Sequence, residues 1–248
     1  MQKIIGTFSM IIMAGIMLSA QKIQLKTERW SMEVSGKGQV MAMAGKDMFS
    51  NYVAQGEQAP LLQIRVGDQW HIPTKATFKS GMMTLQFLNE GISAQIKILQ
   101  KKTHITFELI NLSAKDKVNA VIWGPFPTVI GKTIGEVVGV VRDGSFAIGL
   151  QALNPKTVGG VFHSSEGANK ESGATAIGST ATAQPYGSSL QAFSLDRSKD
   201  RVLTVWGRPE MHVKAIPNET TIGSKIALFG CEEAEVLSRI GEIEVAEG

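Results

Sequence analysis

The tryptophans of this chain are the side chains best suited to recognise a sugar ring. An aromatic face packs against the apolar face of a pyranose, and planar polar side chains bind its hydroxyl groups. Trp70 adjoins His71 ahead of Pro73, whereas Trp123 and Trp206 each end an expected strand and enter a turn that contains glycine and proline. Binding residues collect in the loops at the ends of sheets.

Core packing is the alternative for every tryptophan, because buried aromatic residues dominate the cores of β-sandwiches. The polar candidates are histidine and arginine residues close to expected turns. The candidate carbohydrate-binding residues are Trp70, His71, Trp123, Arg142, His163, Trp206 and Arg208.

A histidine and a carboxylate could together act as general acid and base at the anomeric carbon of a sugar. The pairs His163 with Glu166 and His71 with Glu210 have the right residue types, and either pair works only if folding brings its members together. The four histidines stand singly, without an H-x-H or H-E-x-x-H spacing, so no metal site is predicted.

Other catalytic motifs are absent from the sequence. Gly131-Lys132-Thr133 matches the end of a phosphate-binding loop, but Phe126 stands where the first glycine belongs, and the surrounding pattern is that of strands. There is no Gly-x-Ser-x-Gly elbow, and Cys231 has no histidine near it in the sequence. We therefore assign no catalytic residue in this segment and expect no cofactor.

The overall charge argues against a nucleic-acid partner. Lys and Arg number 25 against 22 Asp and Glu, a formal net charge of +3 at pH 7, which provides no electrostatic footprint for DNA or RNA. The single cysteine, Cys231, excludes a disulfide framework and a cysteine-based zinc site. We expect Cys231 to be buried as a small hydrophobic residue.

Residues 1–20 have the pattern of a secretory signal peptide. Lys3 precedes an uncharged apolar run from Ile4 to Ala20 that closes on small residues. Cleavage after Ala20 would leave Gln21 as the first residue, and an uncleaved membrane anchor is the alternative. No cysteine near the cut could carry a lipid, so we expect a secreted or periplasmic protein without membrane contact after cleavage.

From Ile23 onwards, short runs alternate between apolar and polar residues, the period-two signature of half-buried strands. Asp143-Gly144 lies between two such runs and is a strong hairpin signal, because both residue types tolerate positive φ angles. Ser80-Gly81 and residues 100–103 mark two more hairpins. Helical periodicity is almost absent before residue 231.

About a dozen short strands without intervening helices predict an all-β fold, an antiparallel two-sheet sandwich over residues 21–230. The stretch from Ser164 to Ser189 is rich in small residues and predicts a long surface loop. Acidic residues after Gly230 predict a short C-terminal helix over residues 231–240. The remainder, to Gly248, is expected to begin a linker towards a missing downstream domain.

Three parts of the sequence carry a resemblance to a known kind of protein. They are Trp123-Gly124-Pro125-Phe126-Pro127 with Gly131 to Glu136, Val140 to Gly149, and Phe229 to Glu233 with Ile243 to Gly248. Together they resemble the N-terminal β-sandwich region of large secreted glycan-degrading enzymes, of glycoside hydrolase type, from Bacteroidetes-type bacteria. The resemblance is best from residue 118 to residue 248. It implies a separate catalytic domain beyond Gly248, and it carries no catalytic residue over to this segment.

The leading hypothesis is an accessory β-sandwich of a secreted polysaccharide-processing glycoside hydrolase, without catalytic residues of its own. Its partners would be the downstream catalytic domain of the same chain and a polysaccharide or oligosaccharide. Two alternatives remain open: a stand-alone sugar-acting enzyme, mutarotase-like or lyase-like, and a surface glycan-binding module. An enzyme would depend on a histidine and a carboxylate, whereas a binding module would depend on exposed tryptophans.

Overall fold

The computed structural model describes residues 22–46, 50–160, 179–205 and 208–248, with only the backbone for 201–205 and 208–211. The strands are β1 (Ile23–Lys26), β2 (Trp30–Val34), β3 (Val40–Gly45), β4 (Leu62–Val66), β5 (Gln69–His71), β6 (Lys75–Lys79), β7 (Met82–Phe87), β8 (Ile92–Gln100), β9 (Ile105–Leu112), β10 (Val118–Thr128), β11 (Thr133–Gly135), β12 (Val140–Arg142), β13 (Phe146–Ala152), β14 (Val158–Gly159), β15 (Ala181–Gln184), β16 (Gly187–Leu195), β17 (Arg201–Val205), β18 (Arg208–Val213) and β19 (Lys225–Glu232). The helical elements are the 3₁₀ turns η1 (Leu88–Glu90), η2 (Lys115–Lys117) and η3 (Glu233–Glu235) and the α-helix α2 (Val236–Glu247).

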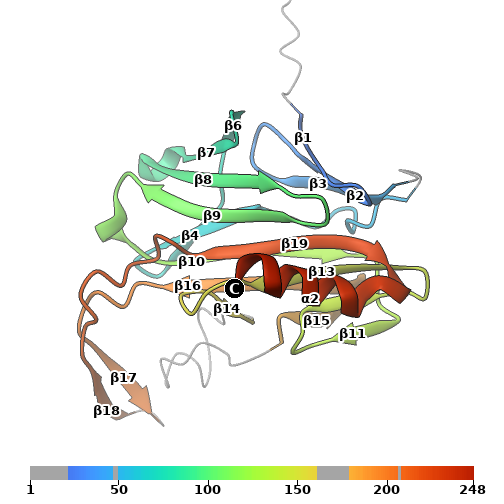
Figure 1. Cartoon of the computed structure of the whole chain (residues 1–248). Coiled ribbons are helices and arrows are strands. Elements are labelled where there is room, and N and C mark those ends of the chain that lie inside the picture. Colours follow the sequence, from blue (N-terminus) through green and yellow to red (C-terminus); the bar gives the residue numbers. More distant parts are fainter. Residues whose placement is uncertain (1–21, 47–49, 161–178, 206–207) are drawn as a thin grey trace, which may run out of the picture.

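Two large antiparallel sheets form the predicted sandwich (Figure 1). The first has eight strands in the order β11-β12-β13-β19-β9-β8-β7-β6. The second follows the order β14-β16-β10-β4-β5, and β15 also pairs with β16. Strands β1 to β3 form a separate three-stranded sheet, and the hairpin β17–β18 projects from one end (Figure 1). The prediction of an all-β sandwich with a short C-terminal helix is confirmed.

The predicted hairpins are present, and their turns use the residues that the sequence suggested. Ser80 and Gly81 join β6 to β7 with φ angles of 50° and 78°, both in the left-handed region. Asp143 and Gly144 lie between β12 and β13, where the Asp143 carboxylate accepts hydrogen bonds from the backbone N–H groups of Ser145 (2.8 Å) and Phe146 (2.9 Å). Asp143 therefore has the backbone role typical of a turn aspartate.

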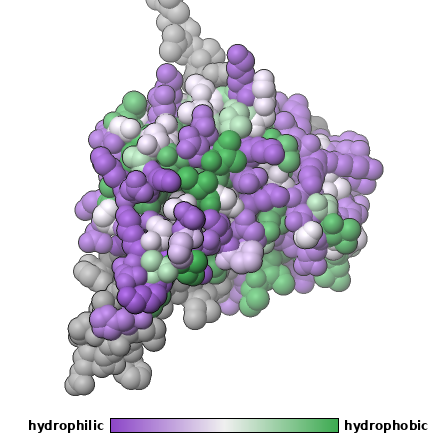
Figure 2. All heavy atoms as spheres, turned by 60° about the vertical axis from the view of Figure 1, so that its left-hand side comes forward, coloured by the Kyte–Doolittle hydropathy of each residue, from purple (hydrophilic) through white to green (hydrophobic). Residues whose placement is uncertain are grey.

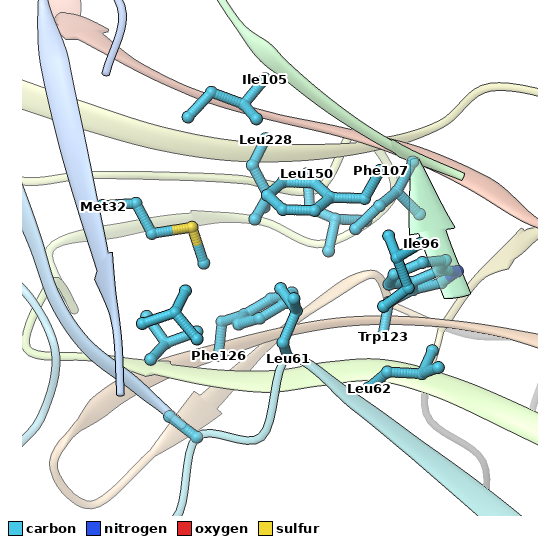
Figure 3. Packing of buried hydrophobic residues seen from close by; sticks show 14 of the residues in the cluster. Met32, Leu61, Leu62, Ile96, Ile105, Phe107, Trp123, Phe126, Leu150 and Leu228 are labelled. Atoms are coloured by element: carbon cyan, nitrogen blue, oxygen red, sulfur yellow. The ribbon is translucent and has the colours of Figure 1, made fainter. Parts of the chain in front are cut away.

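The core lies between the sheets, where side chains from both of them interdigitate (Figure 3). Alternation along β9 places Ile105, Phe107 and Leu109 in this core, each with no exposed surface. Met32 reaches the same core from the three-stranded sheet (Figure 3). One continuous hydrophobic cluster therefore holds all three sheets together.

Strand β19 is buried on both faces from Ile226 to Cys231, which explains why this stretch contains no charged residue. Ile226 and Leu228 face the sandwich core, whereas Phe229 and Cys231 lie on the opposite face in a second cluster with Ile243 of α2. A half-exposed strand would alternate; this one is covered by a sheet on one side and a helix on the other.

The C-terminal helix has different bounds from the predicted range of residues 231–240, because Cys231 and Glu232 still belong to β19 and α2 begins at Val236; a linker to a downstream domain stays a prediction. Helix α2 continues to Glu247, and Ile243 is fully buried against the outer face of β19. The helix extends because its apolar side chains cover the outer face of the sheet at β12, β13 and β19, where they form one cluster. The expected burial of Cys231 is confirmed.

Two further boundaries differ from the predictions. Strand β10 does not end at Trp123 but runs on to Thr128, with a register shift between Trp123 and Phe126. Gly124 makes this bulge possible: its φ is +90°, and a Cβ there would lie 2.8 Å from the Phe126 nitrogen. The stretch of small residues expected to be a loop ends in β15 and the first residues of β16, because small side chains such as Ala181 and Ser188 fit fully buried positions.

Candidate functional site

Trp70 and His71, adjacent candidates from the sequence, lie at a small surface hollow of about 190 Å³. The hollow lies between β5 and the η1 turn that follows β7. Its apolar lining includes Phe87 and Leu88, and Leu88 is 63% exposed. Figure 2 shows the end of the sandwich that carries η1. On this side of the molecule, hydrophobic side chains form a patch within a largely hydrophilic surface.

A tight turn positions one side of this hollow, and hydrogen bonds of Thr74 position the other. A two-residue turn of Gly67 and Asp68 reverses β4 into β5, and Gly67 has a φ of +60° that suits such a turn. On the other side, the Thr74 hydroxyl donates a hydrogen bond to the Gln86 carbonyl (3.1 Å) and accepts one from the Leu88 N–H (3.4 Å). Thr74 thereby ties the start of η1 to the segment that leads into β6.

His71 faces a carboxylate across the hollow. Its Nδ1 lies 3.5 Å from Oε1 of Glu90, and the side chains are 22% and 29% exposed. Asn89, next to Glu90 in η1, adds a planar amide to the same lining. The hollow thus combines an indole, an imidazole, an amide and a carboxylate, the residue types that hold sugar hydroxyls or move a proton.

The carboxylate partner of His71 was not predicted. Glu210 was the expected partner, but only the backbone of Glu210 is described, in β18. The sequence does not pair Glu90 with His71, because Glu90 follows a strand of the eight-stranded sheet whereas His71 ends a strand of the other sheet, and only the packing of the two sheets brings η1 beside β5. Its one sequence signal is the Asn89-Glu90-Gly91 turn after a strand, which is too common a pattern to be specific.

Trp123 is a core residue, so its prediction as a sugar-binding residue is wrong. It has no exposed surface, and its indole Nε1 donates a hydrogen bond to Ser224 Oγ at 2.8 Å. Its ring packs against Phe107 with centroids 6.4 Å apart (Figure 3). The physical reason is the bulge at Gly124, which lets β10 continue and keeps Trp123 between the sheets instead of at a strand end.

Arg142 lies away from the hollow. Its strand, β12, and the strand that leads into η1, β7, are close to opposite ends of the eight-stranded sheet. The Arg142 guanidinium lies 3.5 Å from the Glu233 carboxylate in η3, so this side chain is occupied in an ion pair close to the start of α2.

The remaining candidates lie outside the described part of the chain. His163, Glu166 and Trp206 belong to segments that the structure does not describe, and Arg208 is described by its backbone only, at the start of β18. Their roles, including the His163–Glu166 pair, stay predictions.

A second histidine–glutamate pair lies beneath the end of α2. Nε2 of His104 is 3.1 Å from Oε1 of Glu247, and Lys101 and Lys225 also contact this carboxylate, Lys225 at 2.7 Å. Burial raises the pKa of Glu247, but hydrogen bonds from the two lysines and His104 outweigh it and hold the pKa at about 2. Burial lowers the pKa of His104, so the ring is neutral at pH 7. With its proton on Nε2, facing Glu247, the ring accepts a hydrogen bond from the Thr103 hydroxyl at Nδ1.

Within the described ranges, no three histidine, cysteine or acidic side chains gather in a way that could hold a metal ion. The same residues contain no helix of sufficient length and apolar character to span a membrane.

Comparison with known proteins assigns no family. No family model matches the sequence, and no curated protein matches it. Among solved structures, the chain is similar to a galactose mutarotase-like protein from Lactobacillus casei ATCC 334, with 11% identity, a TM-score of 0.28, and coverage of 86% of this chain and 88% of the other. At this TM-score the match carries no argument about function.

Proposed function

We propose that this protein is a secreted carbohydrate-binding β-sandwich, and that it holds a sugar in the hollow formed by Trp70, His71, Asn89 and Glu90. The observation that carries the proposal is the convergence of these four side chains, from two separate hairpins, on one concave surface. The alternative sites proposed from sequence have less support, because Trp123 is buried and Arg142 is paired.

The chemistry of the hollow suits a hydroxylated ring better than a charged or wholly apolar ligand. Trp70 and Leu88 offer apolar surface, whereas Asn89 offers an amide that can donate and accept hydrogen bonds at once. His71 and Glu90 oppose each other at 3.5 Å, so an imidazole and a carboxylate are placed together beside the apolar surface. Small ligands are typically held in this way, by a mainly apolar lining with a few placed polar groups.

Titration calorimetry against neutral polysaccharides (xylan, laminarin and galactomannan) tests the proposal. The Trp70→Ala variant should lower the affinity for the preferred polysaccharide by about thirtyfold, the effect expected of a central aromatic anchor. Phe78→Ala is the matched control, because Phe78 is a partly buried aromatic residue on β6 that does not line the hollow. Equal binding by wild type and Trp70→Ala would reject this location, and absence of binding to the whole panel would reject the proposal.

A second candidate function is acid–base catalysis on a sugar, favoured by the 3.5 Å approach of His71 Nδ1 to Glu90 Oε1. Interconversion of the two anomers of a reducing sugar needs one group to donate and another to remove a proton, and this pair supplies both. Polarimetry with freshly dissolved glucose and galactose should show faster mutarotation that His71→Ala and Glu90→Gln both abolish. Mutarotation at the uncatalysed rate, together with retained binding, would leave binding as the function.

The accessory role and the secreted location remain proposals, supported by the apolar run of residues 4–20 and by the resemblance to glycan-degrading enzymes. Amino-terminal sequencing of the protein exported by its native host should begin at Gln21. The accessory role predicts that the reading frame continues past the codon for Gly248 into a catalytic domain. A stop codon there would remove the same-chain partner and leave a stand-alone binding protein.

A further inference from the structure

A second and larger hollow, of about 690 Å³, adjoins the first. The two share Ile72 and Thr74 in their linings, so the segment that leaves β5 forms the border between them. The far side of the larger hollow comes from the turn between β2 and β3 and from residues 51–59. Its volume is within the roughly 300–1,000 Å³ range of ligand sites, whereas the first hollow is below it.

The larger hollow is a built feature of the fold. At the turn between β2 and β3, Gly38 has a φ of +77°, and a Cβ there would lie 2.8 Å from Cγ of Pro73. The turn therefore packs directly against the segment that borders both hollows. Gln39 and Asn51 stiffen the wall: the Gln39 side chain accepts a hydrogen bond from the Ala59 N–H (3.1 Å), and the Asn51 amide donates one to the Met41 carbonyl (3.0 Å).

Two glutamines in this hollow remain available to a ligand. Gln55 and Gln58 are exposed, and their side chains form no hydrogen bond with any residue that the structure describes. An amide presents a donor and an acceptor side by side, which matches neighbouring hydroxyls of a sugar. Among the described residues of the lining, the only ionisable side chains are those of Lys37 and Glu57, which have opposite charges, so these residues favour a ligand without net charge.

We propose that the two hollows form one groove that binds a linear, neutral oligosaccharide. One sugar unit would lie in the small hollow against Trp70, and the following units would cross Ile72 and Thr74 into the larger hollow beside Gln55 and Gln58. This inference rests on the proposed function of the small hollow. It adds the class of ligand, a chain and not a single sugar, and a second set of binding residues.

Chain length is the variable that tests the groove. Titration calorimetry would compare mono-, di-, tetra- and hexasaccharides prepared from whichever neutral polysaccharide binds. Affinity should rise by about tenfold or more from the mono- to the tetrasaccharide and then level off, because each added unit gains contacts only while it lies in the groove. A single-site hollow would instead show one affinity for all lengths.

Variants separate the two halves of the groove. Gln55→Ala combined with Gln58→Ala should weaken the tetrasaccharide by about tenfold, as expected for the loss of two hydrogen bonds, and leave the monosaccharide unchanged. Trp70→Ala should lower the affinity for both the tetrasaccharide and the monosaccharide. Gln184→Ala is the control, because Gln184 is an exposed glutamine on β15 that lines neither hollow.

Each outcome decides between the two proposals. Length-independent affinity, or a double glutamine variant that binds the tetrasaccharide like wild type, would overturn the groove and leave the Trp70 hollow as a single-unit site. A ligand that binds independently of Trp70 but depends on the glutamines would overturn both the location of the proposed function and the continuous groove. Absence of binding by every sugar, at every length, would overturn both proposals together.

Discussion

The two histidine–glutamate pairs of this protein have the same chemical groups and different surroundings. His71 and Glu90 lie 3.5 Å apart at a surface hollow, with side chains 22% and 29% exposed. His104 and Glu247 lie 3.1 Å apart with side chains 2% and 5% exposed, and Lys101 and Lys225 complete the cluster. Burial and two lysines make the second pair a structural anchor, whereas the first pair borders the open hollow that we propose as the ligand site.

The largest expected difference is in stability. Glu247→Gln should lower the free energy of unfolding by about 3 kcal/mol at neutral pH, because the pKa of this carboxyl is about 2 in the folded protein and about 4.3 in an unfolded chain. Urea unfolding measures the change, and Glu244→Gln, an exposed glutamate on the same helix, is the control. A loss equal to that of the control would show that the cluster does not anchor α2.

Opening of α2 should be visible at Cys231. The thiol is fully buried in the cluster that α2 covers, and burial raises its pKa to about 11, so an alkylating reagent should react with it slowly. If Glu247 holds the helix down, Glu247→Gln should speed iodoacetamide labelling by about a hundredfold, which corresponds to the same loss of about 3 kcal/mol. Unchanged labelling in a destabilised variant would place the opening elsewhere in the sandwich.

Acid should weaken the buried pair in two steps. Burial lowers the pKa of His104 in the folded state, so the unfolded chain takes up this proton more readily than the folded protein does. The stability associated with neutral His104 is therefore fully present above about pH 6.5 and is lost as the pH falls below that value. The contribution of Glu247 is present above about pH 4.3 and is lost as pH falls towards about 2. Thermal unfolding from about pH 7 to about pH 3 should show both losses. Glu247→Gln should remove the lower step, and persistence of that step in the variant would assign it to another carboxyl.

The partly exposed pair, His71 and Glu90, should have the smallest effect on stability. Glu90→Gln should change the free energy of unfolding by less than about 0.5 kcal/mol, the range of exposed ion pairs. The same variant should weaken sugar binding by about tenfold through the loss of a charged hydrogen-bond acceptor. A large loss of stability would show that Glu90 mainly holds η1 in place, which contradicts its assignment to a binding site.

The sequence predicted the parts of the fold that depend on local chemistry. Asp143-Gly144 and Ser80-Gly81 form hairpins because their backbone preferences are properties of the residues themselves. The length of α2 could not be predicted, because residues 241–247 become helical by covering the outer face of β19, a surface that exists only after the sheet has formed. The continuation of β10 past Pro125 likewise depends on strand partners from other parts of the chain.

The sequence predicted two of the four side chains to which we assign sugar binding. Trp70 and His71 are neighbours in sequence and line the same hollow, so a single segment was enough to identify them. Glu90 required knowledge of which hairpins meet, information that neither spacing nor residue type contains. Trp123 shows the reverse error: residue type suggested binding, whereas burial and a hydrogen bond to Ser224 assign it to the core.

The position of Glu247 makes the protein sensitive to loss of the last turn of α2. A truncated variant that ends at residue 246 would lose the partner of two lysines and a histidine at once. Three polar groups would then lie uncompensated beside the apolar cluster under α2. Two truncated variants, one ending before and one ending after Glu247, should therefore differ in stability by far more than a single residue of helix would explain.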